Sequence, residues 1–452
     1  MMTRRRTGII FFPAFDWSIS ITHPEREERL LYTRDQVFEE GLFDFDNIFE
    51  YSPGIASLSD INRVHICVPN CDSVLTETHR ISAGGAITAA EKVMEGAVDN
   101  AFALVRPPGH HAMRFVYGTR GFCIINVEAI MVEYIRRKYG HRRIAIVDTD
   151  CHHGDGTQDI YWHDPDTLYI SLHQDGRTLY PGTGFIGEFG GPNALGTTIN
   201  IPLPPHTSDE GFLYVCDNLI LPIIDEFQPD LIINSAGQDN HFTDPLTSMN
   251  FSAQGYAALT SRLSPHIAVL EGGYSIESAL PYVNLGIILA MAGLDYSNVR
   301  EPTFKPHEIQ QSDAVTERIK RDVAVIYQLW KTRHEQRRDV IADKSTMTRK
   351  KTIFYDTDHI TEKQVETVFM CDECGGLVTI SSSTGHHPPV YAVIIPGRSC
   401  PSCRRRGKEI FHRTTTDDFH AIYLQDREHD VFCVKEDKRC GVTETASPTT
   451  TA

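Results

Sequence analysis

The residues best suited to chemistry follow an apolar run at positions 144–147. Five titratable side chains come directly after it: Asp148, Asp150, His152, His153 and Asp155. Such a β-branched run is typical of a strand buried on both faces of a parallel sheet. Asp150 and His152 are two positions apart, so they point the same way if the extended backbone continues. A carboxylate and an imidazole aimed at one point suit a zinc ion. The alternative is a loop whose polar residues only cap the next helix.

Side chains capable of chemistry also follow other expected strands. We expect strands at residues 9–12, 64–68, 102–105, 144–147, 168–172, 231–234 and 267–270, and helices at 23–41, 82–93, 129–139, 219–227 and 280–291. This alternation predicts a largely parallel sheet with helices on both faces. Ligands of such sheets bind at the carboxyl ends of the strands. One shared site is therefore expected from the residues that follow these strands: His110, His111, Asp148, Asp150, His152, Asp155, Asp239 and Tyr274.

Composition limits the class of protein. The 452 residues exceed one ordinary domain, so we expect one large domain and an appendage. An apolar fraction of 41% is enough for a sizeable core. The formal net charge of -17 argues against a general nucleic-acid binder, since such proteins are basic. It favours cationic substrates such as basic protein tails or polyamines.

The N-terminus and the cysteines indicate the compartment. An arginine run at 4–6 followed by apolar residues at 8–12 imitates a secretory signal, but the apolar run is short and Pro13 and Asp16 interrupt it. No stretch approaches the roughly 18 apolar residues of a membrane helix. Scattered cysteines with CxxC pairs indicate a reducing compartment and metal binding rather than a disulfide framework. We expect a cytoplasmic protein without a membrane partner.

Eight motifs resemble, in order and spacing, the zinc-dependent histone deacetylase family, which includes acetoin utilisation proteins and acetylpolyamine amidohydrolases. They are HPER at 23–26, RPPGHHA at 106–112, GFC at 121–123, DTDCHHGDGTQ at 148–158, SLH at 171–173, PGTG at 181–184, SAGQD at 235–239 and EGGY at 271–274. The resemblance covers about residues 7–300. It implies an α/β fold of three layers, the arginase/deacetylase-like fold, with a mainly parallel central sheet.

The resemblance assigns three residues to a catalytic zinc ion. Asp150, His152 and Asp239 match the zinc ligands. Three protein ligands leave a position for water and for a carbonyl oxygen, as catalytic rather than structural zinc requires. A potassium ion is also implied, at positions matched by Asp148, Asp150, His152, Ser171 and Leu172.

The same family pattern assigns the proton-transfer residues. His110 and His111 match a tandem histidine pair, with His111 as the proton shuttle and His110 as its electrostatic partner. Asp148 would orient His110, and Asp155 would orient His111. Tyr274 would donate its hydroxyl to the substrate carbonyl oxygen.

The substrate channel of the family has aromatic walls. Gly121 and Phe122 match one wall, and Tyr180 matches the other, where phenylalanine is frequent. Asp72 matches a rim aspartate that holds the substrate backbone. Two positions depart from the family: Val127 stands where a second asparagine is frequent, and Gln238 where an apolar residue is usual. Neither removes a catalytic group.

The C-terminal residues predict a second metal site. Cys371, Cys374, Cys400 and Cys403 form two CxxC pairs, which favour a structural zinc ion in a small β-rich zinc ribbon. A redox dithiol is the alternative. With little apolar core of its own, such a domain would need the metal to fold. The basic run at 404–406 predicts a nucleic-acid or acidic protein partner, or else a solvated turn. Cys433 and Cys440 receive no role.

We therefore expect a deacetylase catalytic domain at residues 1–330, a charged linker at 331–351, a zinc-ribbon-like domain at 352–440 and a disordered tail at 441–452. The expected activity is zinc-dependent deacetylation of N-acetyl-lysine in proteins. An acetylpolyamine or other small acyl-amine deacylase is the first alternative. A two-metal ureohydrolase shares the fold, but the tandem histidines and Tyr274 argue against it. A non-catalytic acyl-lysine binder or scaffold acting through the zinc ribbon is the last alternative.

Overall fold

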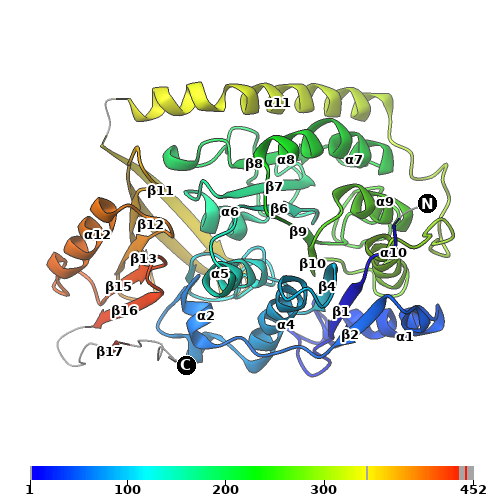
Figure 1. Cartoon of the computed structure of the whole chain (residues 1–452), viewed down its shortest axis with the longest axis horizontal. Coiled ribbons are helices and arrows are strands. Elements are labelled where there is room, and N and C mark those ends of the chain that lie inside the picture. Colours follow the sequence, from blue (N-terminus) through cyan, green and yellow to red (C-terminus); the bar gives the residue numbers. More distant parts are fainter. Residues whose placement is uncertain (1–2, 343–344, 437–442, 445–452) are drawn as a thin grey trace.

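A central sheet of eight strands organises the first part of the chain in the computed structural model (Figure 1). The structure describes residues 3–342, 345–436 and 443–444. Across the sheet the order is β2 (Ile48–Tyr51), β1 (Thr7–Phe12), β4 (Asn100–Val105), β10 (Ile267–Leu270), β9 (Leu231–Ala236), β6 (Ile144–Asp148), β7 (Thr167–Gln174) and β8 (Thr198–Leu203). Neighbouring strands are parallel throughout. The expected fold class is confirmed.

Helices cover both faces of this sheet and complete three layers (Figure 1). One face packs on α4 (Glu77–Met94) and α5 (Val127–Tyr139). The other packs on α7 (Asp209–Val215), α8 (Leu221–Phe227), α9 (Ala253–Leu263) and α10 (Leu280–Ala292), with α1 (Leu31–Glu39) against α10. The small residues of α4 allow a close approach, since a Cβ on Gly85 would lie 2.6 Å from Val105 Cγ1. Short helices α2 (Leu58–Asn62), α3 (Cys71–Val74) and α6 (Asp155–Tyr161) lie in the connections.

The strands expected for the centre of the sheet are confirmed, but the prediction lacks the two edge strands. Neither edge strand was expected, because neither has the continuous apolar run of the inner strands. β2 is mostly exposed, and β8 alternates polar with apolar residues and contains Pro202, which an edge position tolerates. The strand expected at 64–68 is shorter than predicted: β3 (Ile66–Cys67) forms there, and it pairs with β5 (Phe115–Val116) outside the central sheet.

Helix α11 (Asp313–Ile341) runs along the outside of α7 and β8 (Figure 1). Its buried side chains recur every three or four residues, as one face of a helix requires: Ile319, Val323, Ile326 and Trp330. Residues 331–351, expected as a charged linker, instead contain the end of α11 and the start of the next strand. The charge pattern alone could not distinguish a linker from an exposed helix, because the outer face of a helix has a similar composition.

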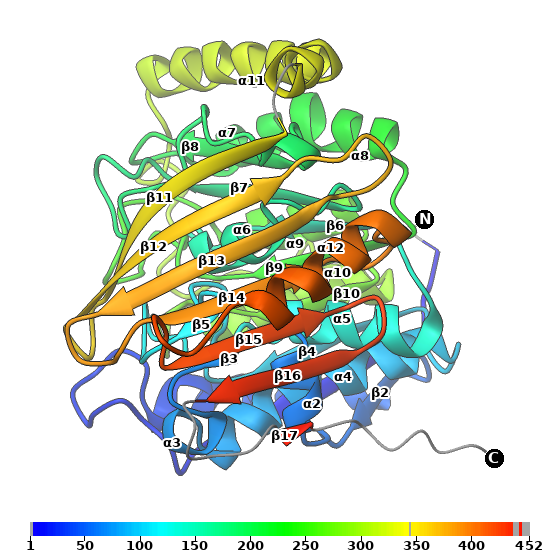
Figure 2. The ribbon, with the colours of Figure 1, turned by 90° about the vertical axis from the view of Figure 1, so that its left-hand side faces the viewer.

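The C-terminal part forms a second sheet, which faces the viewer in Figure 2. Its seven strands, in order, are β11 (Thr346–Tyr355), β12 (Ile360–Phe369), β13 (Leu377–Thr384), β14 (Val390–Ile395), β15 (Ala421–Asp426), β16 (Val431–Glu436) and β17 (Thr443–Glu444). The pair β14–β15 is parallel and joined by α12 (Pro401–Arg413); the others are antiparallel. The threonine-rich tail lies outside the described residues apart from β17.

Both faces of the second sheet are packed, which gives it more apolar core than we expected. On the outer face, α12 places Phe411 on Val393 and Ile422. The inner face shares a core with the first part of the chain, where Phe115 and Tyr117 meet a set of side chains from β11 to β15: Ile353, Tyr355, Val368, Val378, Ile380, Val390, Ala392, Ile394, Ala421 and Tyr423. None of the helices in the described ranges combines the length and apolar character that crossing a membrane requires.

Candidate active site

The expected site residues meet at the carboxyl ends of four strands. β4, β10, β9 and β6 are consecutive neighbours in the sheet, and each is followed by part of the site. His110 and His111 follow β4, Tyr274 follows β10, and Asp239 follows β9. The remaining residues end β6 or follow it: Asp148, Asp150, His152 and Asp155. Parallel strands therefore bring together residues that are up to about 160 positions apart in the sequence.

Asp150, His152 and Asp239 form a compact group of metal-type donors. One donor atom from each lies within 4.8 Å of the others. His152 Nδ1 is 2.7 Å from Asp239 Oδ2 and 3.3 Å from Asp150 Oδ1. Gly272 makes this approach possible, since a Cβ there would lie 2.6 Å from both Asp150 Oδ2 and Asp239 Oδ2.

The electrostatics of this group fit a bound cation. Both carboxylates are buried. Burial, and then the negative charge of Asp150, raises the pKa of Asp239. Burial opposes ionisation of Asp150 too, but His110 and His152 hold its pKa below the ordinary value. A divalent ion would relieve the repulsion between the two carboxylates, and zinc accepts this carboxylate–imidazole–carboxylate set.

Two adjacent histidines lie beside this group in different charge environments. His110 Nδ1 is 3.1 Å from Asp148 Oδ2, and His111 Nδ1 is 2.9 Å from Asp155 Oδ1. Burial alone would lower the pKa of His110, but Asp150 and Asp148 raise it to about 10. Burial and the neighbouring His110 lower the pKa of His111 to about 3. The pair thus combines a cationic imidazole with a neutral one.

Tyr274 lies on a loop that a buried ion network holds in place. Arg29 Nε donates to the carbonyl of Gly273 at 2.7 Å and Arg29 Nη1 to Glu25 Oε2 at 2.8 Å. Arg106 Nε donates to the other oxygen of Glu25 at 2.7 Å. Burial raises the pKa of Tyr274 well above its usual value, so its hydroxyl remains a donor. The network explains why the HPER and RPPGHHA motifs accompany the site.

Phe122 and Tyr180 flank the histidines. The Tyr180 ring centroid is 5.2 Å from that of His111, and the Phe122 ring is 5.5 Å from that of Tyr274. Phe122, Tyr180 and Gly121 are all partly exposed, and the His152 side chain is 13% exposed. The site is therefore not sealed from solvent on the side of these residues.

Two expected groups are less closely tied to the site. Asp72 is exposed in α3, and no hydrogen bond of the described residues joins it to the channel walls. The residues expected to hold potassium lie on β6, on β7 and just after β6, with Asp148 and Ser171 in register. Leu172 is buried, and Asp148 Oδ1 accepts from the backbone N–H of Asp150 at 3.1 Å.

The second sheet contributes contacts that we did not expect. Arg120 donates to the carbonyl of Phe354 on β11 and also to Asp155 Oδ2, the partner carboxylate of His111. Asp356, in the β11–β12 turn, accepts from Gly121 and Tyr180. No local pattern signals such contacts, because their partners are 176 to 235 positions apart.

The four expected cysteines form a separate cluster at one end of the second sheet. Cys371 and Cys374 lie between β12 and β13, and Cys400 and Cys403 lie at the start of α12. The sulfur atoms of Cys371 and Cys400 are 3.8 Å apart. This is close to the edge of a tetrahedron with Zn–S distances of about 2.3 Å. The backbone N–H of Gly376 donates to Cys374 Sγ at 3.3 Å, as is common around zinc-bound thiolates.

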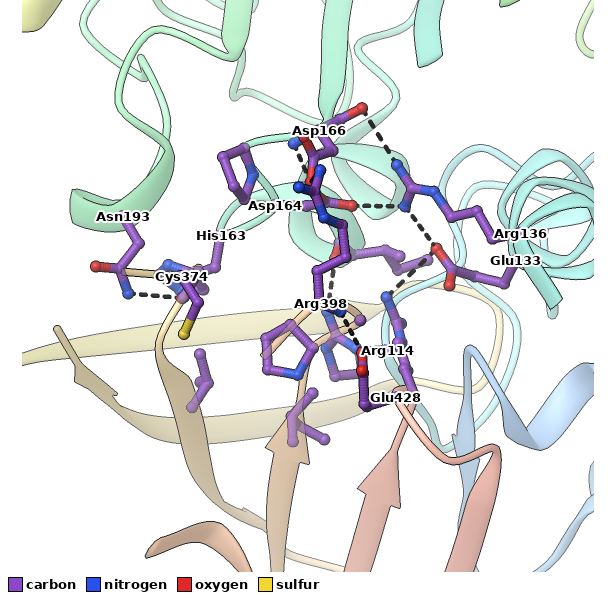
Figure 3. A pocket seen from close by; sticks show the side chains of 18 of the residues that line it. Arg114, Glu133, Arg136, His163, Asp164, Asp166, Asn193, Cys374, Arg398 and Glu428 are labelled. Atoms are coloured by element: carbon purple, nitrogen blue, oxygen red, sulfur yellow. Dashed lines mark hydrogen bonds and ion pairs between the residues drawn. The ribbon is translucent and has the colours of Figure 1, made fainter. Parts of the chain in front are cut away.

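A cavity of about 590 Å³ lies between the two sheets, and none of the site residues described above except Cys374 lines it (Figure 3). Its charged side chains largely pair with one another. Arg136 is 2.6 Å from Asp164 and 3.0 Å from Glu133. The basic run expected at 404–406 lies in α12, where Arg404 pairs with Glu428 at 3.1 Å. The cavity is therefore lined by side chains that form ion pairs with one another, at the interface between the second sheet and the first part of the chain.

The fold and this site define an α/β protein with a group of metal-type donors at the carboxyl ends of parallel strands, and comparison with known proteins specifies its family. Residues 68–284 match the family described as the histone deacetylase domain. The chain is 47% identical over 324 residues to a probable deacetylase of Archaeoglobus fulgidus, covering 66% of this chain and 89% of that protein. It is 31% identical over 328 residues to acetoin utilization protein AcuC of Bacillus subtilis, covering 64% of this chain and 83% of that protein.

Two further comparisons agree. A histone deacetylase-like amidohydrolase of Pseudomonas aeruginosa is 36% identical over 247 residues, with 53% of this chain and 64% of that protein covered. The crystal structure of the HDA15 HD domain superposes with a TM-score of 0.62 at 25% identity, covering 75% of this chain and 99% of that one. The chain belongs to the histone deacetylase family, and the expected resemblance is confirmed.

Proposed function

We propose that the chain is a zinc-dependent amidohydrolase that removes the acetyl group from N-acetyl-lysine in proteins. The observation that carries the proposal is the convergence of three metal-type donors, a tandem histidine pair and a tyrosine hydroxyl at four adjacent strand ends. Amide hydrolysis needs an activated water, a proton shuttle to the leaving amine and a donor for the oxyanion. The family membership supports a deacetylase, and the acetyl-lysine substrate is our inference.

Asp150, His152 and Asp239 would hold the zinc ion. When bound, zinc supplies a Lewis acid for the amide carbonyl and lowers the pKa of water. The chain's own residues then divide the proton transfers. Because Asp155 engages Nδ1 of His111, the Nε2 lone pair is free to accept the proton of the attacking water.

His111 then returns that proton to the nitrogen of the leaving amine, so that amide and water become amine and acetate. His110, hydrogen-bonded to Asp148 through Nδ1, would stabilise negative charge that develops nearby. The Tyr274 hydroxyl would donate to the carbonyl oxygen as it becomes an oxyanion. Potassium at Asp148 and its neighbours would screen the buried carboxylates.

Replacing Tyr274 by phenylalanine tests this mechanism. The variant should lose about 100- to 1,000-fold in kcat, the effect of removing one oxyanion donor. Bound metal, measured by mass spectrometry, should remain. Tyr282→Phe in α10 makes the same chemical change away from the site and serves as the control. Full activity of Tyr274→Phe would contradict the assigned role.

An acetylpolyamine or other small acyl amine is the second candidate substrate, favoured by the net charge of -17. Acetate release from an acetyl-lysine peptide and from an acetylated polyamine separates the two. Loss of release with a chelator, and its recovery with zinc, would support the metal requirement. Two bridging metals per catalytic site would instead support the ureohydrolase alternative.

For the C-terminal part, we propose that residues 352–440 hold a structural zinc ion through the four cysteines, and that the catalytic domain comprises residues 1–330. The sulfur geometry supports the metal, and the dithiol alternative predicts none. A protein or nucleic-acid partner of this part is a weaker proposal, since Arg404 is already paired. The scaffold alternative predicts that Tyr274→Phe leaves the cellular role intact. We further propose a cytoplasmic location.

A further inference from the structure

The turn between β11 and β12 brings two carboxylates of the second sheet to the loop that carries Phe122. Asp356 Oδ1 accepts from the backbone N–H of Gly121 at 2.9 Å and from the Tyr180 hydroxyl at 3.1 Å. Asp358 Oδ2 accepts from the backbone N–H of Thr119 at 2.6 Å. The turn therefore touches both aromatic walls of the channel, although it belongs to the other part of the chain.

Asp356 lies at the hydroxyl end of the Tyr180 side chain. The ring of Tyr180 meets His111 edge to face, with centroids 5.2 Å apart, while its hydroxyl donates to Asp356. The side chain thus extends from the candidate proton shuttle to this carboxylate. Asp356 is itself only partly buried. A chain lying along Tyr180 from the metal-type donors outward would end beside Asp356.

One oxygen of the Asp356 carboxylate remains available as an acceptor. Both bonds of Asp356 to the walls use Oδ1, and the hydrogen bonds of the described residues include none to Oδ2. Arg120, next to Gly121, is already engaged by Asp155 and by the carbonyl of Phe354. A partly exposed carboxylate in this position is a strong acceptor for an ammonium group.

We propose that Asp356 is a specificity-determining residue that binds a positively charged group at the far end of the substrate's alkyl chain. The inference rests on the proposed function and selects between its two candidate substrates: acylated diamines and related amines, whose second nitrogen is cationic, are preferred over acetyl-lysine within a protein. The acyl amide lies at the metal-type donors, the methylenes lie between Phe122 and Tyr180, and the ammonium donates to Oδ2 of Asp356. The second sheet is thus part of the active site.

A matched pair of substrates isolates the charge. N-acetyl-1,5-diaminopentane and N-acetylpentylamine have the same amide and the same chain, but only the first carries an ammonium. In Asp356→Asn, the amide oxygen still accepts from Gly121 and Tyr180, so the wall contacts persist while the charge is removed. We expect the ratio of the two kcat/KM values, charged over neutral, to fall about five- to tenfold in the full-length variant.

Asp358→Asn is the control, because it removes the same charge two positions away from the same turn. Its ratio should stay within about twofold of the wild-type ratio, as for an exposed charge. The proposal is overturned if Asp356→Asn keeps the wild-type ratio, or if Asp358→Asn lowers it equally. If the wild type hydrolyses neither compound nor an acetyl-lysine peptide, the proposed function fails, and the same ratio is then taken from the calorimetric Kd values of the intact compounds. Hydrolysis of the peptide alone overturns the inference and leaves the proposed function standing.

Discussion

His110 and His111 are identical residues that the fold places in opposite charge states. His110 lies between two carboxylates, and its pKa rises to about 10. His111 is buried beside the resulting cation, and its pKa falls to about 3. Pairs whose environments push their pKa values apart are a frequent basis for dividing acid and base roles. The pairing of Nδ1 with Asp155 leaves Nε2 of His111 as the acceptor, which supports His111 as the group that accepts a proton first.

Arg120 links this histidine to the second sheet, and we predict that it positions Asp155. Arg120→Gln would break the bridge between Asp155 and the carbonyl of Phe354. We expect kcat to fall about 10- to 100-fold, as for other groups that orient a catalytic side chain, with a smaller change in KM. Arg120→Lys should recover part of the loss, since it keeps the charge. Steady-state kinetics with metal content measured in parallel provides the test.

The control for this prediction is Arg177→Gln, whose side chain is 64% exposed and lies outside the site. It should leave kcat near the wild-type value. An increase in KM without a change in kcat for Arg120→Gln would show that Arg120 does not act through Asp155. Equal activity of the glutamine and lysine variants would show the same.

The site residues that could be predicted all follow strands in recognisable motifs. The apolar run before Asp148 located the strand, and the polar residues after it located the site. Arg120 and Asp356 could not be predicted in this way. Their partners lie more than 170 positions away, and an acidic turn such as 356–358 reads as an ordinary solvated hairpin end. The contacts depend on how the second sheet docks, which no local pattern encodes.

At the scale of elements, strand β12 buries a carboxylate inside the second sheet. Burial raises the pKa of Glu362 to about 7, although Ser382, Gln364 and Tyr355 donate to it and oppose the rise. The folded state therefore binds this proton more tightly than the unfolded state, whose pKa is about 4.3. The stabilisation is complete below that value and is lost as the pH rises towards 7.

We accordingly predict that Glu362→Gln changes the pH dependence of stability. Relative to wild type, its free energy of unfolding should rise by about 2–3 kcal/mol between pH 5 and pH 8, because only wild type must bury the charge. Urea unfolding at the two pH values measures this difference. Glu409→Gln, at an exposed position of α12, should show no such change. Parallel pH profiles for wild type and Glu362→Gln would refute the prediction.

At the scale of the whole molecule, the second sheet shares an apolar core with the β3–β5 pair of the first part, and the two parts should unfold together. Val368 and Val365 lie on the same strand, but Val368 is 1% exposed in the shared core and Val365 is 41% exposed. Val368→Ala should lower the free energy of unfolding by about 2 kcal/mol, while Val365→Ala should change it by less than about 0.5 kcal/mol. Urea unfolding followed by fluorescence should give one transition. Two separate transitions would show that the parts fold independently.

The shared core also has a consequence during protein synthesis. Its first contributors, including Phe115 and Tyr117, leave the ribosome long before Tyr423, the last of their partners. At about 5–20 residues per second, the intervening chain of about 300 residues takes roughly 15–60 s to make. Five of the eight strands of the central sheet, β6 to β10, emerge within that interval, while an apolar surface on the nascent chain has nothing to cover it. Molecular chaperones that bind exposed apolar segments would meet this chain at that surface.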